Sequence, residues 1–275
     1  MSQTAFDADF GRAWQELHVT ERQGYQTSVT DYHRHDFYEI NLILSGNVRI
    51  LLGDGVEEGC AHRIVLTRPH TPHYVSCNSD TLYHRLYLLF TEDFAAGHLS
   101  EWHELASVFG ENGTVLTLSD EESALFAKRI LSVKEESSPL RQRLIVYDLL
   151  SRLGDLKQRQ KPPEGNIPPY ILQALTYLDE NYAEHIVAAD LARRLHVGRT
   201  ALMTEFKRHV GATITEYLTH RRLRQAVSLL RAGHTTEDTA ALCGFADASG
   251  LSRAFRRCYG QTPRAYIKNQ KTDAQ

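Results

Sequence analysis

The 275-residue sequence has few cysteines, no long apolar run and no large excess of charge of either sign. Its four cysteines, Cys60, Cys77, Cys243 and Cys258, lack CxxC spacing, which argues against a disulfide framework and against a zinc ribbon. No run approaches the ~20 apolar residues that a membrane span needs, and the N-terminal residues contain no signal-peptide core. We therefore expect a cytoplasmic protein with reduced thiols and no membrane partner.

The length and the charge distribution indicate two domains of different character. A chain of 275 residues is long enough for two domains, each with its own core. Residues 170–275 hold 15 Lys and Arg against 10 Asp and Glu, whereas residues 1–169 hold 16 against 24. A C-terminal net charge of +5 beside an N-terminal net charge of −8 favours nucleic-acid binding by the C-terminal domain only.

Residues 1–118 have the pattern of an antiparallel β domain. Short apolar runs alternate with clusters of Gly, Pro, Asp and Asn, and the Gly53-Asp54-Gly55 segment is a strong hairpin signal. Many short strands without a long amphipathic helix predict an antiparallel barrel or a double-sheet jelly roll. The predicted strands lie in residues 39–44, 48–52, 64–66, 74–76 and 82–90.

The apolar spacing becomes helical from Ser119, where Ser119-Asp120-Glu121-Glu122 fits a capping box. The Ser137-Ser138-Pro139 break divides residues 119–160 into a pair of helices. The second helix carries an apolar stripe from Leu140 to Leu156. This stripe either packs on the barrel and on the neighbouring helix or forms a dimer contact, and the two hypotheses are compatible.

A linker is predicted at residues 161–169, which hold four prolines and one glycine, and an all-helical domain at residues 170–275. In this domain a short helix, a tight turn and a second helix are predicted for residues 188–211 and again for residues 236–260. Each second helix carries one inward Phe followed by two basic residues. This spacing is typical of a helix-turn-helix, whose second helix enters the major groove of DNA. A helix from Thr213 to Arg231 would place the two reading helices in major grooves one turn apart, roughly 34 Å.

Further signatures lie around the second helix-turn-helix unit. The sequence reads Arg221-Arg222-Leu223-Arg224-Gln225-Ala226 with Leu229-Leu230, then Gly244-Phe245, then Leu251-Ser252-Arg253-Ala254-Phe255-Arg256, then Gly260-Gln261-Thr262-Pro263-Arg264-Ala265-Tyr266. These segments, in roughly the last hundred residues, resemble the AraC/XylS family of bacterial transcription regulators. Thr236 and Thr239, where the family usually has Ile, and Leu251, where it usually has an aromatic residue, are departures that we expect to weaken packing in the second unit.

The resemblance implies an α+β fold in three parts. An N-terminal antiparallel β-barrel, similar to cupins and jelly rolls, would be followed by two helices and then by a C-terminal all-α domain with two helix-turn-helix units. The resemblance also implies promoter DNA as the target, a homodimer, activation of transcription, and RNA polymerase as a further partner.

The N-terminal, solvent-facing positions of a recognition helix reach base edges. From these positions and from the family alignment, we expect base contacts from Arg199, Thr200, Met203, Thr204, Ala248, Ser249 and Arg253. Arg253 is the strongest candidate because an arginine can bond both acceptors of a guanine; the alternative is a solvated or phosphate-bound arginine. We expect other basic residues to neutralise phosphate without reading sequence, namely Lys207, Arg208, Arg222, Arg256 and Arg257.

The segment from Tyr32 to Gly46 resembles the first cupin motif, His-x-His-x3-Glu-x6-Gly, with His33, His35 and Glu39 at its ligand positions. His73 follows a proline at the place of the second motif's histidine, although the usual glycine is absent. Side chains two residues apart in an extended strand share one face, so these groups can converge. Three histidines and one glutamate could hold a divalent metal.

We favour a metal-free pocket in which His33, His35, Glu39 and His73 bind a polyhydroxylated effector directly, because the resemblance to AraC-type sensor domains implies such a pocket. A sugar needs paired donors and acceptors on one wall and an aromatic platform on another. Tyr83, Arg85 and Tyr87 share one strand face and could supply the second wall, but the sequence does not show whether this is the pocket face.

The leading hypothesis is a ligand-responsive, sequence-specific transcription regulator, an activator of carbohydrate-related genes with a sugar-like effector in the N-terminal barrel. We expect no enzyme activity, no catalytic residue and no cofactor, because no general acid or nucleophile stands at a recognisable spacing. The alternative is a metal-binding cupin, sensor or enzyme, fused to a DNA-binding domain. A third hypothesis is a DNA-binding protein whose N-terminal domain only dimerises.

Overall fold

The structure is a computed structural model that describes residues 16–24, 35–52, 55–59, 61–77, 82–96, 99–160 and 167–272. His33 and most of the predicted linker, residues 161–166, lie outside the described residues. The chain divides into two compact units whose boundary in the sequence lies between Ile167 and Pro168. Of the helices that the structure describes, none is both long and apolar enough to cross a membrane.

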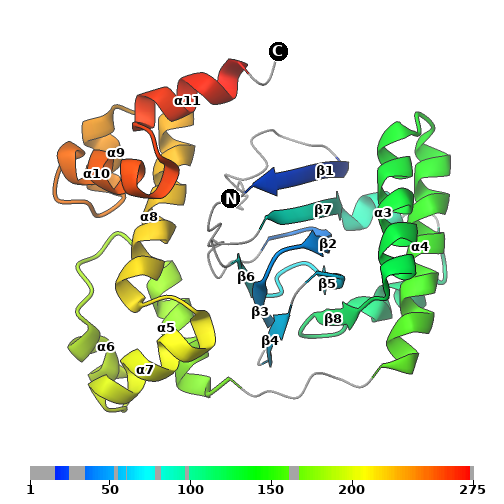
Figure 1. The fold of residues 1–275 in the computed structure, drawn as a ribbon, viewed down its shortest axis with the longest axis horizontal. Helices are drawn as coiled ribbons and strands as arrows, with labels where there is room; N and C mark the ends of the chain where they lie inside the picture. Colours follow the sequence, from blue (N-terminus) through cyan, green and yellow to red (C-terminus); the bar gives the residue numbers. More distant parts are fainter. Residues whose placement is uncertain are drawn as a thin grey trace. The chain divides into compact units, whose positions relative to one another are not determined.

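Two antiparallel sheets form the β part of the N-terminal unit (Figure 1). The five-stranded sheet has the order β1-β7-β2-β5-β8, and the three-stranded sheet has the order β4-β3-β6. The strands are β1 (Leu17–Gly24), β2 (Tyr38–Ser45), β3 (Val48–Leu52), β4 (Gly55–Gly59), β5 (Arg63–Thr67), β6 (His73–Cys77), β7 (Tyr83–Phe90) and β8 (Thr114–Thr117). The predicted antiparallel β architecture is confirmed, and β3 and β4 pair as the predicted hairpin requires. The predicted strands did not include β1, β4 or β8.

The five-stranded sheet has two differently covered faces because side chains alternate along each strand. On one face, Ile40, Leu42 and Leu86 belong to a core shared with the helices that follow the strands. On the other face, Ile43 and Val65 pack with apolar residues of β3 and β6, so the two sheets share an interior. Full burial of each such side chain contributes roughly 1.5–3 kcal/mol.

Helices complete the N-terminal unit on the first of these faces. The short helices α1 (Glu92–Ala96), α2 (Trp102–Ala106) and η1 (Ser107–Phe109) precede β8, whereas α3 (Asp120–Glu135) and α4 (Pro139–Arg159) follow it. The predicted capping box is present: the Glu122 amide donates to the Ser119 hydroxyl, and the Ser119 amide donates to the Glu122 carboxylate. This reciprocal pair satisfies two amides at the start of α3.

The apolar stripe of α4 is buried in the core along most of its length. Leu149, Leu153 and Leu156 are buried in the core that α4 shares with the five-stranded sheet. At the N-terminal end of the helix, Leu140 and Leu144 are 65% and 57% exposed. Packing within the unit therefore accounts for the C-terminal part of the stripe and leaves two leucines facing solvent.

The C-terminal unit is all-helical, as predicted (Figure 1). Its helices are α5 (Pro169–Glu180), α6 (Ala188–Arg194), α7 (Arg199–Val210), α8 (Ile214–Arg231), α9 (Thr236–Leu242), α10 (Ala248–Tyr259) and α11 (Pro263–Thr272). The long helix α8 packs on both helix-turn-helix units. Tyr217 of α8 meets the Phe206 ring of α7 edge-on, whereas Leu223 and Val227 share a core with Phe255 of α10.

The turns of the two helix-turn-helix units have the same hydrogen-bond pattern. The Val197 amide donates to the Ala192 carbonyl at 3.0 Å, and the Phe245 amide donates to the Ala240 carbonyl at 2.9 Å. Each bond closes the C-terminal end of the first helix of its unit, as in a Schellman motif. The repeat seen in the sequence is therefore a repeat of backbone geometry.

The residue before each of these amides has a left-handed backbone, with φ of 54° at His196 and 73° at Gly244. Glycine adopts this conformation most readily. At Gly244 a second constraint applies, because an added Cβ would lie 2.2 Å from the carbonyl oxygen of Ala183. Gly244 thus allows the second unit to approach the chain between α5 and α6.

Two of the three family departures in the second unit are buried, whereas Thr236 is half-buried. Thr239 and Leu251 are fully buried, and the Thr239 hydroxyl has no hydrogen-bond partner among the described residues. A buried hydroxyl without a partner costs about 1–3 kcal/mol relative to an apolar side chain. This cost is a physical reason for the weaker packing that we expect where Thr replaces Ile.

Candidate functional site

The two recognition helices, α7 and α10, present matching faces. Each buries a Leu and a Phe, Leu202 with Phe206 in α7 and Leu251 with Phe255 in α10. The opposite face carries the residues that we predict to contact bases. Of these, Ala248 is half-buried, and the following are exposed: Arg199, Thr200, Met203, Thr204, Ser249 and Arg253.

Four of the residues predicted to contact phosphate are exposed near the C-terminal ends of the recognition helices. These are Lys207 and Arg208 on α7, and Arg256 and Arg257 on α10. Arg208 also pairs with Glu205, whose Oε2 lies 2.5 Å from its Nη2. Their exposure leaves all four able to follow a phosphate backbone.

Arg222 differs from these residues because its guanidinium has partners inside the protein. From α8, its Nε donates to the Tyr182 carbonyl and its Nη2 donates to the Glu184 carbonyl, both at 2.7 Å. The neighbouring Arg221 pairs with Asp179 of α5. The two arginines hold α8 to α5 and to the segment that follows it, a role that sequence reasoning missed. Phosphate contact by Arg222 stays a prediction beside this structural role.

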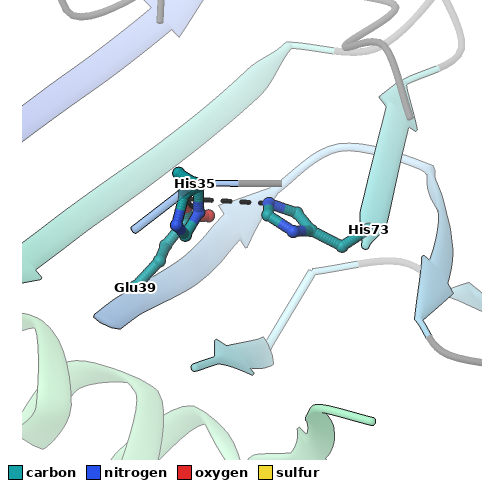
Figure 2. A group of neighbouring side chains, drawn as sticks. All are labelled: His35, Glu39 and His73. Atoms are coloured by element: carbon teal, nitrogen blue, oxygen red, sulfur yellow. Dashed lines mark hydrogen bonds and ion pairs between the residues drawn. The ribbon is translucent and has the colours of Figure 1, made fainter. Parts of the chain in front are cut away.

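The predicted effector residues that the structure describes form a buried cluster between the two sheets: His35, Glu39 and His73 (Figure 2). Glu39 lies on β2, His35 precedes that strand, and His73 begins β6 of the other sheet. The Oε2 atom of Glu39 lies 3.2 Å from Nε2 of His35 and 3.9 Å from Nε2 of His73. The fourth predicted residue, His33, lies outside the described residues, so its role stays a prediction.

Backbone carbonyls orient both imidazoles of the cluster. Nδ1 of His35 lies 2.9 Å from the Phe37 carbonyl oxygen, and Nδ1 of His73 lies 2.9 Å from the Thr71 carbonyl oxygen. Because a carbonyl oxygen can only accept, each Nδ1 carries a proton and donates it. The other nitrogen of each ring, Nε2, faces Glu39.

This orientation determines how the Glu39 carboxylate is neutralised. A neutral imidazole with its proton on Nδ1 presents a lone pair at Nε2, which would repel a carboxylate. The short contact therefore requires a proton between the two atoms, on His35 or on the Glu39 carboxyl, or else a donor or cation from a ligand. Burial raises the pKa of Glu39, but the hydrogen bond from His35 and the positive charges of His73, His35 and Arg85 lower it overall. Glu39 is thus an ionised acceptor in the protein interior.

Strand register decides which face Tyr83, Arg85 and Tyr87 occupy. Tyr87 of β7 is directly paired with Asn41 of β2, and directly paired residues of an antiparallel sheet project to the same side. Asn41 is two residues from Glu39 and shares its face. The alternating aromatic and basic side chains of β7 therefore line the interior that contains Glu39, and all of them are buried.

Two more polar side chains lie on this inter-sheet face. Thr67 of β5, which sequence reasoning missed, is directly paired with Glu39. The Asn41 Oδ1 and Thr67 Oγ1 atoms are buried and have no hydrogen-bond partner in the part of the chain that the structure describes. Buried polar atoms normally have a partner, so a hydroxyl-bearing ligand would satisfy both. An apolar run ending in Thr offers no signal for such a role.

Two family models match the chain. One, described as an AraC-like ligand binding domain, matches residues 18–150, and the other, described as a helix-turn-helix domain, matches residues 191–269. The chain is similar to the HTH-type transcriptional activator RhaS of Yersinia pseudotuberculosis, with 28% identity over 246 residues that cover 84% of this chain and 87% of that protein. RhaS of Yersinia pestis matches with the same identity and coverage.

Solved structures give more distant likenesses. ToxT from Vibrio cholerae matches 92% of this chain and 98% of its own at 14% identity, with a TM-score of 0.42. The DNA-binding domain of AdpA, solved in complex with a target DNA, matches 38% of this chain and 94% of its own at 25% identity, with a TM-score of 0.36.

The structural role of Arg222 can be tested by the substitution Arg222→Ala. We expect it to lower the free energy of unfolding of the C-terminal unit by about 1–2 kcal/mol, because two carbonyls lose their donor. Thermal unfolding of the full chain measures this loss, with Arg256→Ala, an exposed arginine on α10, as the matched control. Equal unfolding temperatures for the two variants would contradict the role.

Proposed function

The chain belongs to the AraC/XylS family of transcription regulators, and on this premise we propose that it activates carbohydrate-related genes in response to a small sugar-like effector. One observation carries the proposal: a single chain combines two helix-turn-helix units with a ligand-binding domain whose interior is buried and polar. We place its action in the cytoplasm, at promoter DNA, with RNA polymerase as a partner and without an enzymatic step.

We propose that α7 and α10 enter successive major grooves on one face of the duplex, about 34 Å apart. Packing of both units on α8 supports a fixed separation between these helices. The exposed Arg253 is suited to bond O6 and N7 of a guanine, while Met203 and Ala248 are suited to contact a thymine methyl. The exposed basic residues that follow would contact phosphate and set the register.

The effector site that we propose is the inter-sheet interior. A sugar hydroxyl both donates and accepts, and the interior offers the Glu39 carboxylate, the Asn41 and Thr67 oxygens and the Nε2 atoms of His35 and His73. The aromatic side chains of β7 on the same face supply a platform for an apolar sugar face. Hydrogen bonds to an ionised group are stronger than neutral ones, so Glu39 is expected to anchor the hydroxyls.

A metal-binding cupin, sensor or enzyme, is the second candidate function. The possible donor atoms of His35, Glu39 and His73 all lie within 4.8 Å of one another. Each imidazole donates from Nδ1 to a backbone carbonyl, which is the outer-shell arrangement of many metal-bound histidines. The two Nε2 atoms and the Glu39 carboxylate fit a divalent cation that keeps open coordination positions. The metal would compete with the effector for Nε2 and Oε2.

A homodimer is part of the proposal, and its contact is expected on α4. Leu140 and Leu144 stand four residues apart, so they share one face of that helix, and both are exposed. Exposed apolar pairs of this kind on a helix mark contacts with a partner when they form a patch. A second copy of the same helix, antiparallel to the first, would cover the pair.

The substitution Arg253→Ala tests base recognition. We expect a loss of about 1–3 kcal/mol that is confined to one base pair, because the bidentate contact to a guanine disappears. Binding to a selected operator and to its single-base variants measures this loss. The control Arg256→Ala should weaken binding to all sequences and flatten the salt dependence by about one unit. A uniform loss with Arg253→Ala would show that Arg253 contacts phosphate.

The effector site is tested by thermal unfolding of the full chain with neutral pentoses and hexoses, each with and without a chelator. A sugar present at one hundred times its Kd should stabilise the folded protein by about 2.7 kcal/mol, chelator present or not. The substitution Glu39→Gln should abolish this shift, and Glu21→Gln, an exposed glutamate of β1, should preserve it. A midpoint that falls with chelator alone, without response to any sugar, would favour the metal-binding function.

The dimer contact is tested by the substitution Leu144→Asp, because a charge within an apolar contact is costly to bury. We expect the unaltered chain to sediment as a dimer and the Leu144→Asp variant to sediment as a folded monomer. Leu242→Asp is the control, since Leu242 is a half-exposed leucine on α9 of the other unit. A Leu144→Asp variant that sediments as wild type does would rule out this face.

A further inference from the structure

We propose that Asp247 is a positioning residue for Arg253, whose guanidinium it holds at the N-terminal turn of α10 so that the arginine reads a guanine. This inference rests on the proposed base contact of Arg253 and adds the group that sets its geometry. The first observation is the place of the carboxylate. Asp247 precedes α10 as its N-cap residue, and its Oδ1 accepts a hydrogen bond from the Gly250 amide at 2.6 Å. This bond fixes the carboxylate at the end of the helix that is predicted to face the bases.

The second observation is that the two charged side chains converge on Gly250. A Cβ atom added to Gly250 would lie 3.4 Å from Oδ1 of Asp247 and 3.9 Å from Nη2 of Arg253. Side chains of a helix lean toward its N-terminus, so Arg253 extends back over the turn that contains Gly250. Both charged residues are exposed. The guanidinium and the capping carboxylate are therefore neighbours on the surface of α10.

The backbone does not require the glycine that lies between these two groups. Gly250 is not among the glycines with positive φ, and its added Cβ would make only ordinary van der Waals contacts. A glycine inside a helix is destabilising relative to an alanine, because it loses more conformational freedom on folding. A longer side chain here would stand between the Asp247 carboxylate and the Arg253 guanidinium. Gly250 thus keeps the space between the two groups open.

The donors and acceptors of the pair allow one guanidinium to serve two partners. An arginine has five N–H donors, and a guanine takes two of them through O6 and N7. Three donors remain for a carboxylate, and Asp247 keeps acceptor capacity on Oδ2 after its Oδ1 has bonded the Gly250 amide. Rotation of the exposed Arg253 side chain brings the two groups into contact. A guanidinium held in this way loses less side-chain freedom on meeting DNA, so more of the contact energy appears as discrimination between bases.

The first recognition helix, α7, has a different set of residues at the same positions. Its N-cap residue is Gly198, which makes no side-chain cap hydrogen bond within the described part of the chain. The positions that correspond to Gly250 and Arg253 hold Ala201 and Thr204. Of the two recognition helices, α10 is therefore the one that combines a capping carboxylate, a glycine and an arginine. The inference places carboxylate-supported guanine reading at the half-site that α10 contacts.

The test is the substitution Asp247→Ser in the full chain, because serine caps a helix about as well as aspartate does but carries no carboxylate. Kd is measured for an operator that the unaltered chain selects from random DNA and for its single-base variants, and Arg253→Ala identifies the base pair that Arg253 reads. Discrimination is the ratio of the variant Kd to the operator Kd at that base pair. We expect Asp247→Ser to reduce this ratio about tenfold at an unchanged unfolding temperature. Asp247→Asn, which caps and keeps a neutral acceptor, should retain part of the ratio.

The matched control is Glu237→Gln, which removes one exposed negative charge from α9 of the same unit. Each variant weakens the repulsion of phosphate and so raises affinity for every sequence, but the control should leave the discrimination ratio unchanged. In the Arg253→Ala background, Asp247→Ser should change the ratio no further, because the two residues act through one contact.

An unchanged ratio in Asp247→Ser would overturn the positioning role and leave the proposed base contact of Arg253 standing. A loss that persists in the Arg253→Ala background would also overturn it, since Asp247 would then contact a base itself. Uniformly weaker binding together with a lower unfolding temperature would make Asp247 a helix cap only. If Arg253→Ala altered discrimination at no base pair, the base contact and the positioning role would both be overturned.

Discussion

A charge that is buried away from water has to be neutralised by a partner, and both units of this protein are organised by that requirement. In the N-terminal unit, burial raises the pKa of Glu39, but the hydrogen bond with His35 and the electrostatic interactions with His73, His35 and Arg85 lower it overall. A fold that needed only stability could have filled the same volume with apolar side chains at no such cost. This polar interior is the reason that we propose a binding site there, in which the donors and acceptors would meet a ligand.

The same requirement applies in the C-terminal unit, where contacts of a half-buried arginine help to hold the two halves together. Arg222 on α8 is half-buried and donates to two backbone carbonyls of the segment after α5, while Gly244 in the second unit approaches Ala183 in that same segment. These contacts, together with apolar packing of α8 on both recognition helices, oppose independent movement of the two units. A fixed separation suits an operator whose two half-sites stand one helical turn apart.

Local signals made the helices and part of the site predictable. The capping box at Ser119 and the left-handed glycines Gly211 and Gly260 mark helix ends within a few residues of chain, so the sequence pattern located them. Motif spacing likewise predicted that His35 and Glu39 converge, because alternation in a strand is a local property. Strand register is not local, because it depends on which strands pair. Only the structure therefore shows the strands β1 and β8, the position of Thr67 beside Glu39, and the face of the sheet on which Arg85 lies.

The most direct measurement of ligand contact is the long-range ¹H–¹⁵N NMR spectrum of the imidazole rings, recorded without a ligand and with the tightest-binding sugar or sugar acid at saturation. We predict that Nδ1 of His35 and of His73 carries a proton in both states, as its carbonyl partner requires. We also predict that their Nε2 signals move on binding, whereas those of His62 and His84, which pair with Asp120 and Glu21, do not. Unchanged His35 and His73 signals at saturation would contradict an effector site between the two sheets.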